Sequence, residues 1–234
     1  MSKDRPILMD AESVNGVLAD RKTQTRRVVK LRNSLIDGFG RVPYGRKWED
    51  FDFTAAYVDN GPSPAGNPGP YLHVPLPCEG TVHRVYSRWT IGQHLWVRET
   101  WGVGTRPHPV EGWYDGIEYR ADETYLEGAD LLPCHRPNIP DDFDLDKYRG
   151  KWRPSIFMPR WASRITRELT DVRVERVQDT TREDIHAEGY QVEQHAMHHE
   201  EIWWKRRWDG INGKTYPYSS NPWVWALTFR RAEP

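Results

Sequence analysis

The segment NPWVWALTFRR, residues 221–231, constrains the fold most strongly, because as a strand it is apolar on both faces. One face would carry Trp223, Trp225, Leu227 and Phe229, and the other would carry Val224 and Ala226. A strand that is apolar on both faces normally lies in the interior of a sheet. The sequence therefore predicts a sheet with this segment as an interior strand.

Other segments have the periodicity of strands or helices. Strands are expected at residues 5–9, in the second half of 21–32, at 94–101, near 114–119 and twice within 152–178, after a turn-like start. Helices are expected from Asp10 to Asp20, over TREDIHAEG (181–189) and over 195–209. Short strands with few helices, without regular βαβ alternation, indicate an α+β fold. We expect a twisted, partly closed barrel.

Local signals set the bounds of the two later helices. Thr180 and Glu183 have capping-box spacing, and Gly189 would close the helix that follows. In the helix over 195–209, Ile202, Trp203 and Trp208 have the spacing of a buried face, and Gly210 would end it.

The length of 234 residues suits one domain that carries insertions. Residues 33–80 include the Gly- and Pro-rich stretch NGPSPAGNPGP, and residues 121–150 end in the acidic DDFDLDKY. Such stretches do not favour regular structure. We therefore expect a single domain over residues 1–234, with insertions at 33–80 and 121–150.

Composition limits the partners and the compartment. Apolar residues make up only 37% of the chain, but 12 Trp and 11 Tyr can supply a small, aromatic-rich core. The net charge of −1 gives no global attraction for nucleic acid, so binding would need a local patch. Two distant cysteines, a polar N-terminus and the lack of a long apolar run favour a cytoplasmic protein with no membrane partner.

The run RKTQTRR, residues 21–27, is the first candidate for function. It supplies the cations and hydroxyls of Arg21, Lys22, Thr23, Thr25, Arg26 and Arg27. On a strand, Thr23, Thr25 and Arg27 would share one face, and Lys22, Gln24 and Arg26 the other. The cluster could hold phosphate, and a lysine in a dry pocket could act as a base or nucleophile. The alternative interpretation is a solvated basic edge strand.

Three further groups have polar residues in patterns that suit a site. Arg98 and Glu99, in WVRET, would form a pocket-facing ion pair or a structural salt bridge. Glu188 ends a short helix beside Gly189, where it would face a cleft or solvent. Arg160, Trp161 and Arg164, in MPRWASRITR, would stack on bases and contact phosphate, or Trp161 would belong to the core.

No metal site and no cofactor are predicted. His195 and His199 stand four residues apart, but the zincin pattern HExxH and a third ligand are lacking in the sequence. An exposed helix face explains this pair better. No P-loop, GxGxxG or GxSxG motif occurs either.

Taken together, these segments resemble the ASCH family of the PUA-like superfamily, in its phage and prophage versions. The similar pieces are ILMDAESVNGVLADRKTQTRR, LWVRETW, WRPSIFMPRWASRI, EDIHAEGY and NPWVWALTFRR, in the order the family has them. The resemblance implies a barrel-like fold with a cleft for RNA, DNA or a modified base. The insertions at 33–80 and 121–150 carry no motif of the family.

The chain is also similar, over its core elements, to a small bacterial ASCH enzyme that hydrolyses the amide of N4-acetylcytidine. Its Lys-x-x-Thr motif matches Lys22 and Thr25, and its catalytic Glu matches Glu188. The resemblance thus implies that Lys22 activates Thr25 or a water and that Glu188 passes the proton to the leaving amine. Glu99 could replace or assist Glu188. Arg21, Arg26, Arg27 and Arg98 would then contact the substrate.

Three functions stay open on the sequence alone. The first is a nucleobase- or nucleic-acid-directed pocket with amidohydrolase activity on an acylated nucleoside. The second is a module that binds RNA or modified DNA without chemistry. The third is a ribonuclease. The expected partners are accordingly a modified nucleoside or a nucleic acid.

Overall fold

The computed structural model describes residues 4–30, 35–36, 50–61, 69–108, 112–127, 144, 147, 149–191 and 200–232. The chain forms two compact units, each built from separate stretches of sequence. The first unit comprises residues 1–22, 93–168 and 230–234, and the second comprises 23–92 and 169–229. The assignment of the whole chain to a single domain stays a prediction.

The first unit begins with β1 (Arg5–Leu8) and α1 (Ala11–Leu18). Asp10 caps the helix by accepting a hydrogen bond of 3.0 Å from the N–H of Ser13, as the sequence predicts. Strand β1 pairs in parallel with β7 (His94–Arg98). On its other side, β7 pairs antiparallel with residues 166–168, where β11 (Thr166–Arg176) begins.

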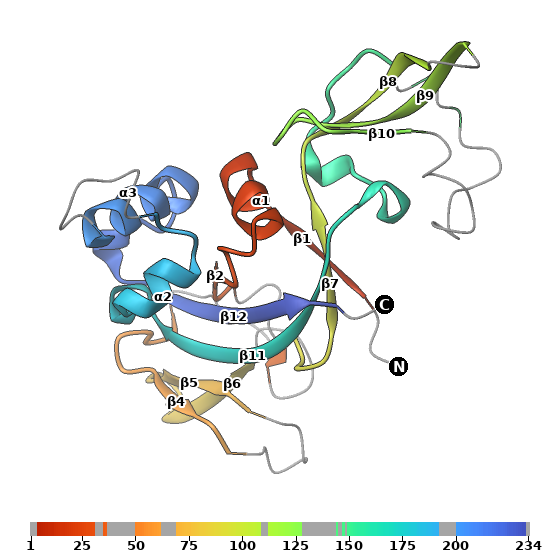
Figure 1. Ribbon diagram of the computed structural model, residues 1–234. Helices are drawn as coiled ribbons and strands as arrows, with labels where there is room; N and C mark the ends of the chain where they lie inside the picture. Colours follow the sequence, from red (N-terminus) through yellow and green to blue (C-terminus); the bar gives the residue numbers. More distant parts are fainter. Residues whose placement is uncertain are drawn as a thin grey trace. The chain divides into compact units, whose positions relative to one another are not determined.

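An antiparallel sheet of three strands completes the first unit (Figure 1). It consists of β8 (Trp101–His108), β9 (Gly112–Tyr119) and β10 (Tyr125–Glu127). The single strand expected over 94–101 is therefore wrong at its end, because the chain leaves β7 after Arg98 and enters β8 at Trp101. A core lies against this sheet, made by Trp101, Val103, Ile117, Tyr119, Met158, Trp161 and Ala162.

The second unit contains the predicted interior strand, β12 (Trp223–Arg231). It lies between β11 and β2 (Gln24–Val28) and pairs antiparallel with β2. Val224 and Trp225 point to opposite faces, and both are buried, at 0% and 2% exposure. The prediction of a strand buried on both sides is confirmed. The strand expected in the second half of residues 21–32 starts earlier than predicted, because β2 begins at Gln24 instead of Arg27.

Residues 33–80 are less irregular than expected. They contain β3 (Leu35–Ile36), β4 (Tyr57–Asp59) and β5 (Tyr71–Leu76), which join β6 (Thr81–Tyr86) in a sheet of order β3-β6-β5-β4. The prediction of an irregular stretch is wrong for β5, whose Tyr71 and Leu72 are fully buried. The Gly and Pro residues around β5 led to the prediction of a loop where the chain forms a short buried strand. Residues 62–68, within the Gly- and Pro-rich stretch, lie outside the described residues.

The segment 152–178 holds one long strand where two were expected. It begins with the single-turn 3-10 helices η5 (Ser155–Phe157) and η6 (Arg160–Ala162), which agree with a turn-like start. Strand β11 then continues without a break from Thr166 to Arg176, and η7 (Val177–Asp179) follows. In residues 121–150, the described part includes β10, and residues 128–143 lie outside it.

Helix α2 (Arg182–Ala187) forms as predicted, but with a different cap. Its capping box joins Thr181 and Asp184 instead of Thr180 and Glu183. The hydroxyl of Thr180 is engaged elsewhere, because it donates to the carbonyl of Val177 at 2.8 Å. Gly189 follows the helix with φ of 103°, a conformation that favours glycine.

Helix α3 (Glu200–Asn212) corrects two expectations. Gly210 does not end it, because one exposed glycine weakens a helix by only about 1 kcal/mol. The buried face carries Trp204 and Trp208, whereas Ile202 is 45% exposed. After α3, the turn η9 (Tyr218–Ser220) leads into β12. Residues 195–199 of the expected helix lie outside the described part.

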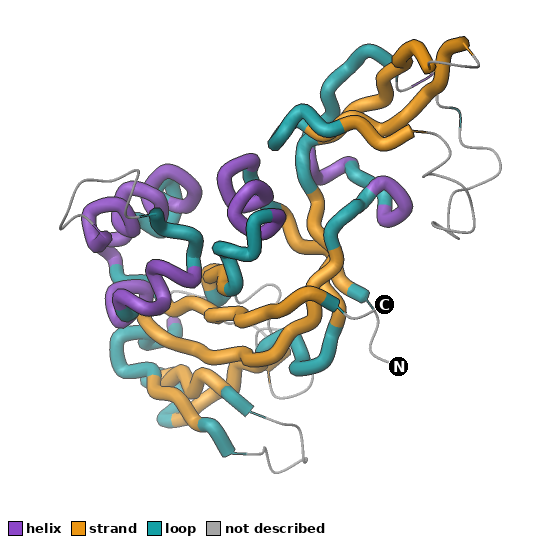
Figure 2. The backbone as a smooth tube through the Cα atoms, viewed as in Figure 1, coloured by secondary structure: helices purple, strands orange, loops and turns teal. Residues whose placement is uncertain are grey.

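The fold is α+β, with strands in mixed and antiparallel sheets and few helices (Figure 2). In the second unit, α2 and α3 lie on one side of β11 and β12, and β4, β5 and β6 lie on the other. Among the described strands, the first and last strands of each sheet do not pair, so the expected barrel is not closed. None of the described helices is long and apolar enough to cross a membrane.

The buried face of α3 gives a stability prediction. Trp208→Ala removes a side chain that is 2% exposed and whose Nε1–H donates to the carbonyl of Tyr216 at 2.8 Å. We expect it to lower the free energy of unfolding by about 3–5 kcal/mol, measured by urea denaturation. The control, Ile202→Ala on the same helix, should change it by less than about 0.5 kcal/mol. Equal losses would contradict the assignment of the buried face.

Candidate functional site

The alternation of β2 sorts the basic run onto two faces, as the sequence predicts. On one face, Nη1 of Arg26 donates to Oε1 of Gln24 at 3.3 Å. On the other, Nη1 of Arg27 donates to Oγ1 of Thr25 at 3.1 Å. Only Arg27 of these four is more than slightly exposed, because β12 and the helices cover the rest. The alternative of a solvated basic edge strand is wrong for Gln24, Thr25 and Arg26.

Arg26 is the centre of a buried ion cluster in the second unit. Its Nε donates to Oε1 of Glu175 at 2.8 Å, and its Nη1 donates to Oε1 of Glu188 at 3.2 Å. Its Nη2 lies 3.0 Å from Oδ2 of Asp184, as an ion pair without the alignment of a hydrogen bond. The Arg26 side chain is 0% exposed. One guanidinium thus holds together a carboxylate of β11 and two of α2.

The surroundings of Arg26 favour its charged form. Burial lowers the pKa of the guanidinium, but the charges of Glu188, Glu175 and Asp184 outweigh burial and raise it. Its Cζ also lies 5.6 Å from the centre of the Trp204 ring on α3, within the range of a cation–π contact. Arg26 is therefore a permanent cation fixed on all sides.

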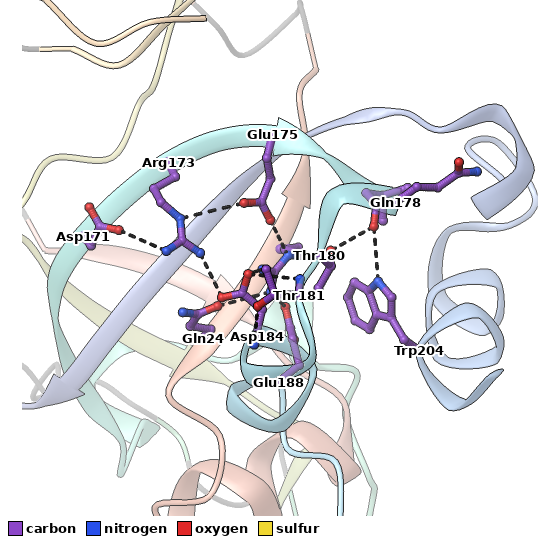
Figure 3. A network of polar contacts seen from close by, with 12 residues as sticks. Gln24, Asp171, Arg173, Glu175, Gln178, Thr180, Thr181, Asp184, Glu188 and Trp204 are labelled. Atoms are coloured by element: carbon purple, nitrogen blue, oxygen red, sulfur yellow. Dashed lines mark hydrogen bonds and ion pairs between the residues drawn. The ribbon is translucent and has the colours of Figure 1, made fainter. Parts of the chain in front are cut away.

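Arg173 adds a second cation at the exposed edge of this cluster. It projects from β11, and its Nη2 donates to Oδ1 of Asp184 at 2.9 Å. Weaker ion pairs of 3.8 Å join it to Asp171 and Glu175 (Figure 3). Its side chain is 43% exposed, in contrast to the enclosed Arg26.

Asp184 connects the cluster to the start of α2. Its carboxylate accepts from the N–H of Thr181 and also contacts Arg26 and Arg173, so one side chain serves the cap and the ion cluster. Burial raises the pKa of Asp184, but Arg26 and Arg173 outweigh it, and the net pKa is lowered. The position of α2 therefore depends on Arg26.

Glu188 sits at the C-terminal end of α2, where its N–H donates to the carbonyl of Asp184 at 2.8 Å. The residue is 7% exposed, and its carboxylate points towards Glu175 and Asp184 in Figure 3. Of the two interpretations weighed for this residue, the solvated one does not fit. The structure brings Glu188 to Arg26, whereas Thr25 faces the opposite side of β2.

Lys22 belongs to the first unit, and Thr25 and Glu188 belong to the second. Lys22 is 4% exposed, and its N–H donates to the carbonyl of Gly16 at 3.0 Å. A Cβ at Gly16 would lie 3.0 Å from Cβ of Lys22, so glycine lets the chain turn tightly after α1. Arg21 is exposed, and its N–H donates to the same carbonyl at 2.9 Å.

The first unit holds a second ion cluster, which is partly buried and centred on Arg164. This guanidinium binds Glu99 through two hydrogen bonds of 2.9 Å and Asp122 through bonds of 2.9 and 2.8 Å. Its Cζ lies 4.0 Å from the centre of the Tyr119 ring. The ion pair of the WVRET segment is thus formed by Glu99 with Arg164, and it fixes the junction between β7 and β8.

The net pKa values of the two carboxylates of this cluster shift in opposite directions. Burial raises the pKa of Glu99, and the contacts with Arg164 do not fully offset it. Burial also raises the pKa of Asp122, but hydrogen bonds from Arg164 and Thr124 outweigh it and hold the pKa at about 2. The net pKa of Arg164 itself is raised by these two partners, against the effect of burial.

The predicted base-stacking group has a different arrangement. Trp161 is 6% exposed and packs edge-to-face on Trp101 at 5.9 Å, so it is a core residue. Arg98 and Arg160 both lie over the Trp96 ring, with Cζ at 4.7 and 5.7 Å from its centre. Arg160 also contacts Asp4 at 3.5 Å. Trp161 therefore offers no free face to a base.

Sequence reasoning missed Glu175, Asp184 and Arg173, which complete the cluster around Arg26. A signal was present in β11, where Asp171, Arg173 and Glu175 alternate with apolar residues and so share one face. No group of His, Cys, Asp or Glu among the described residues has the geometry of a metal site. The pair His195 and His199 lies outside those residues.

Comparisons with known proteins found no matching family model, no matching curated protein and no matching solved structure.

The burial of Arg26 predicts an asymmetry between the two cations of its cluster. Arg26→Met leaves three carboxylates without their shared counter-charge, so we expect a loss of about 3–5 kcal/mol in the free energy of unfolding. Arg173→Met, at the exposed edge, should cost less than about 1 kcal/mol. Urea denaturation of both variants tests this. If Arg26→Met costs no more than Arg173→Met, the cluster does not depend on Arg26.

The lowered pKa of Asp122 predicts a dependence of stability on acid. Because its pKa in the folded state, about 2, is below the usual value of 3.8, the stabilisation is complete above pH 4. It disappears as the pH falls towards 2. Asp122→Asn should therefore lower stability by about 1–2 kcal/mol at pH 6, with the difference from wild type shrinking below pH 4.

The measurement is urea denaturation at several pH values between 6 and 2.5. Glu123→Gln, which removes the exposed carboxylate of the next residue, is the control and should follow wild type throughout. A difference between wild type and Asp122→Asn that stays constant with pH would refute the link to Arg164.

Proposed function

We propose that this chain is a nucleobase-directed hydrolase of the ASCH type, which removes the acyl group from a modified cytidine-type nucleoside. Two observations support the proposal. The motifs containing Lys22, Thr25 and Glu188 resemble those of such an enzyme. Glu188 is also an enclosed carboxylate whose direction is fixed by an ion pair with Arg26, and this contact carries the proposal.

A carboxylate with a fixed direction suits general acid–base catalysis. Proton transfer in a transition state is fast only when the group lies at the correct distance and angle from the reacting atom. Arg26 is itself held by Glu175 and Asp184, so it cannot move without disturbing α2 and β11. The direction of the Glu188 carboxylate is thereby fixed before any substrate binds.

The reaction requires one water and no redox cofactor. In the proposed step, Glu188 accepts a proton from the water while the water oxygen bonds to the acyl carbon. Collapse of the tetrahedral intermediate breaks the bond between that carbon and the exocyclic nitrogen, which takes the proton from Glu188. The products are the free acid and the unmodified nucleoside. Nearby cations would stabilise the intermediate's oxyanion.

The orientation of Thr25 bears on the nucleophile. The resemblance leaves two choices, Thr25 or a water activated by Lys22. Because Thr25 faces away from Arg26 and accepts a hydrogen bond from Arg27, a water that gives its proton to Glu188 is the better choice.

The proposal also includes the fold. We propose that the α+β elements are arranged as in the PUA-like superfamily.

Turnover of a panel of acylated nucleosides, N4-acetylcytidine among them, followed by mass spectrometry, tests this function. Wild type should release the acyl group, and Glu188→Gln should be slower by about 10²–10⁴-fold, the usual contribution of a general acid–base group. Glu183→Gln is the matched control, since this exposed Glu lies on the same helix. It should retain wild-type turnover.

Lys22→Ala is measured beside these variants, with circular dichroism to confirm that each is folded. A wild-type protein that turns over no panel member, or a Glu188→Gln variant as fast as wild type, would rule out the proposal. Binding of nucleic acid without turnover would instead favour a recognition module. Cleavage of an RNA oligonucleotide would favour a ribonuclease.

A further inference from the structure

One long stretch of this nearly neutral chain carries cations and no carboxylates. Residues 147–167 contain seven Lys or Arg residues and no Asp or Glu. Arg160, Arg164 and Arg167 pair with carboxylates elsewhere in the first unit, at 3.5, 2.8 and 3.5 Å. Of the earlier cations, Arg149 and Lys151 are exposed and lie close in the chain to apolar side chains that are exposed too.

Residues 149–157, RGKWRPSIF, form what we call the basic–aromatic segment. Trp152, Ile156 and Phe157 are 43%, 57% and 68% exposed, although such side chains are normally buried. Arg149 and Lys151, which come just before Trp152 in the chain, are also exposed. Large apolar side chains rimmed by charges on a protein surface usually mark a place where another molecule binds.

The backbone of this segment is fixed, so its side chains are displayed in a defined way. Trp101 and Arg153 exchange two backbone hydrogen bonds, of 3.2 and 2.7 Å, and the N–H of Gly150 donates to the carbonyl of Val103 at 3.0 Å. Downstream, Met158 is fully buried in the core. The segment is thus held against β8 at one end and anchored in the core at the other.

Trp152 is oriented by two neighbours. The guanidinium of Arg120 lies 5.1 Å from the centre of its ring, a cation–π distance. Its edge lies close to Gly102, where a Cβ would be 3.6 Å from Cε3. Just before Phe157, the backbone carbonyl of Ile156 accepts a hydrogen bond of 3.1 Å from Nη1 of Arg98. Trp152 therefore has an arginine over its ring, and an arginine holds the backbone just before Phe157.

We propose that the basic–aromatic segment, together with Arg120, binds single-stranded nucleic acid, with bases stacking on Trp152 and Phe157. Exposed rings offer their faces to any unpaired base, and the interleaved cations contact the phosphates. The two ring residues are five positions apart in the chain, which limits their Cα atoms to about 18 Å apart, a span one strand can follow. A duplex, whose bases are already stacked, could use only the cations.

This inference does not rest on the proposed hydrolase. It concerns side chains of the first unit, whereas Thr25, Arg26 and Glu188 belong to the second. Strand binding without turnover of any nucleoside would support the surface alone. Turnover of free nucleosides without strand binding would support the hydrolase alone.

Fluorescence anisotropy with labelled 12-nucleotide RNA and DNA strands, and with a duplex of the same sequence, tests the proposal on the full chain. We expect micromolar binding of both single strands, with the duplex clearly weaker, because the ring contacts do not depend on the sugar. Trp152→Ala and Phe157→Ala should each weaken strand binding by about 5- to 100-fold. Ile91→Ala, which shortens an Ile of 61% exposure in the second unit, is the control and should bind as wild type.

The charge contribution is tested separately through salt. Arg149→Ala/Lys151→Ala should reduce the slope of log K against log salt by about 1.4, or 0.7 for each phosphate that the protein no longer neutralises. The control Lys205→Ala/Lys214→Ala removes two exposed cations of the second unit and should keep the slope.

In the test of the rings, Phe157→Ala is the second variant. Because Phe157 is mostly exposed, this variant still tests the proposal should Trp152→Ala fail to fold.

Several results would overturn the proposal. One is the absence of strand binding at 0.1 M salt. Another is duplex binding as tight as strand binding, which would leave no part for the rings. A third is wild-type affinity in both ring variants, and a fourth is equal displacement of the strand by polyglutamate, which would indicate an anion site without base recognition.

Discussion

The enclosed charge of Arg26 is the constraint on which the second unit depends. A guanidinium without access to water must have its charge balanced and its N–H groups engaged within the protein. Glu175, Asp184 and Glu188 do this from β11 and α2, and Trp204 closes the remaining side from α3. The register of β2 and the placement of both helices are therefore linked through one side chain. Removing that side chain would leave several carboxylates facing one another.

The first unit uses the same device with Arg164. Its planar, forked donors bind Glu99 through two bonds and Asp122 through two more, a geometry that lysine cannot reproduce. The cluster lies where β7 gives way to β8. In both units an arginine with several carboxylates fixes elements that a small, aromatic core does not fix alone. The charged residues of this chain are thus partly internal.

This internal use of charge matters for the functional proposals. Glu188 is a candidate base because a structural cluster fixes its direction, so one contact, with Arg26, serves both the fold and the proposed reaction. The basic–aromatic segment has the opposite character, since its rings and cations are displayed and not enclosed in the core. A carboxylate held by a buried ion cluster and exposed rings held by backbone hydrogen bonds are two different ways of fixing side chains.

The sequence by itself determined the local features of this protein. The two apolar faces of β12, the Asp10 cap of α1 and the split of Gln24 and Arg26 from Thr25 and Arg27 follow from side-chain period and hydrogen-bonding chemistry. Only the tertiary structure decided which carboxylates meet Arg26, because Glu175 and Glu188 lie 149 and 162 residues away along the chain. It also decided which side of α3 is buried, since several stripes of that helix carry tryptophan or isoleucine. Local pattern fixes where a side chain points on its own element, whereas its partners depend on how distant elements pack.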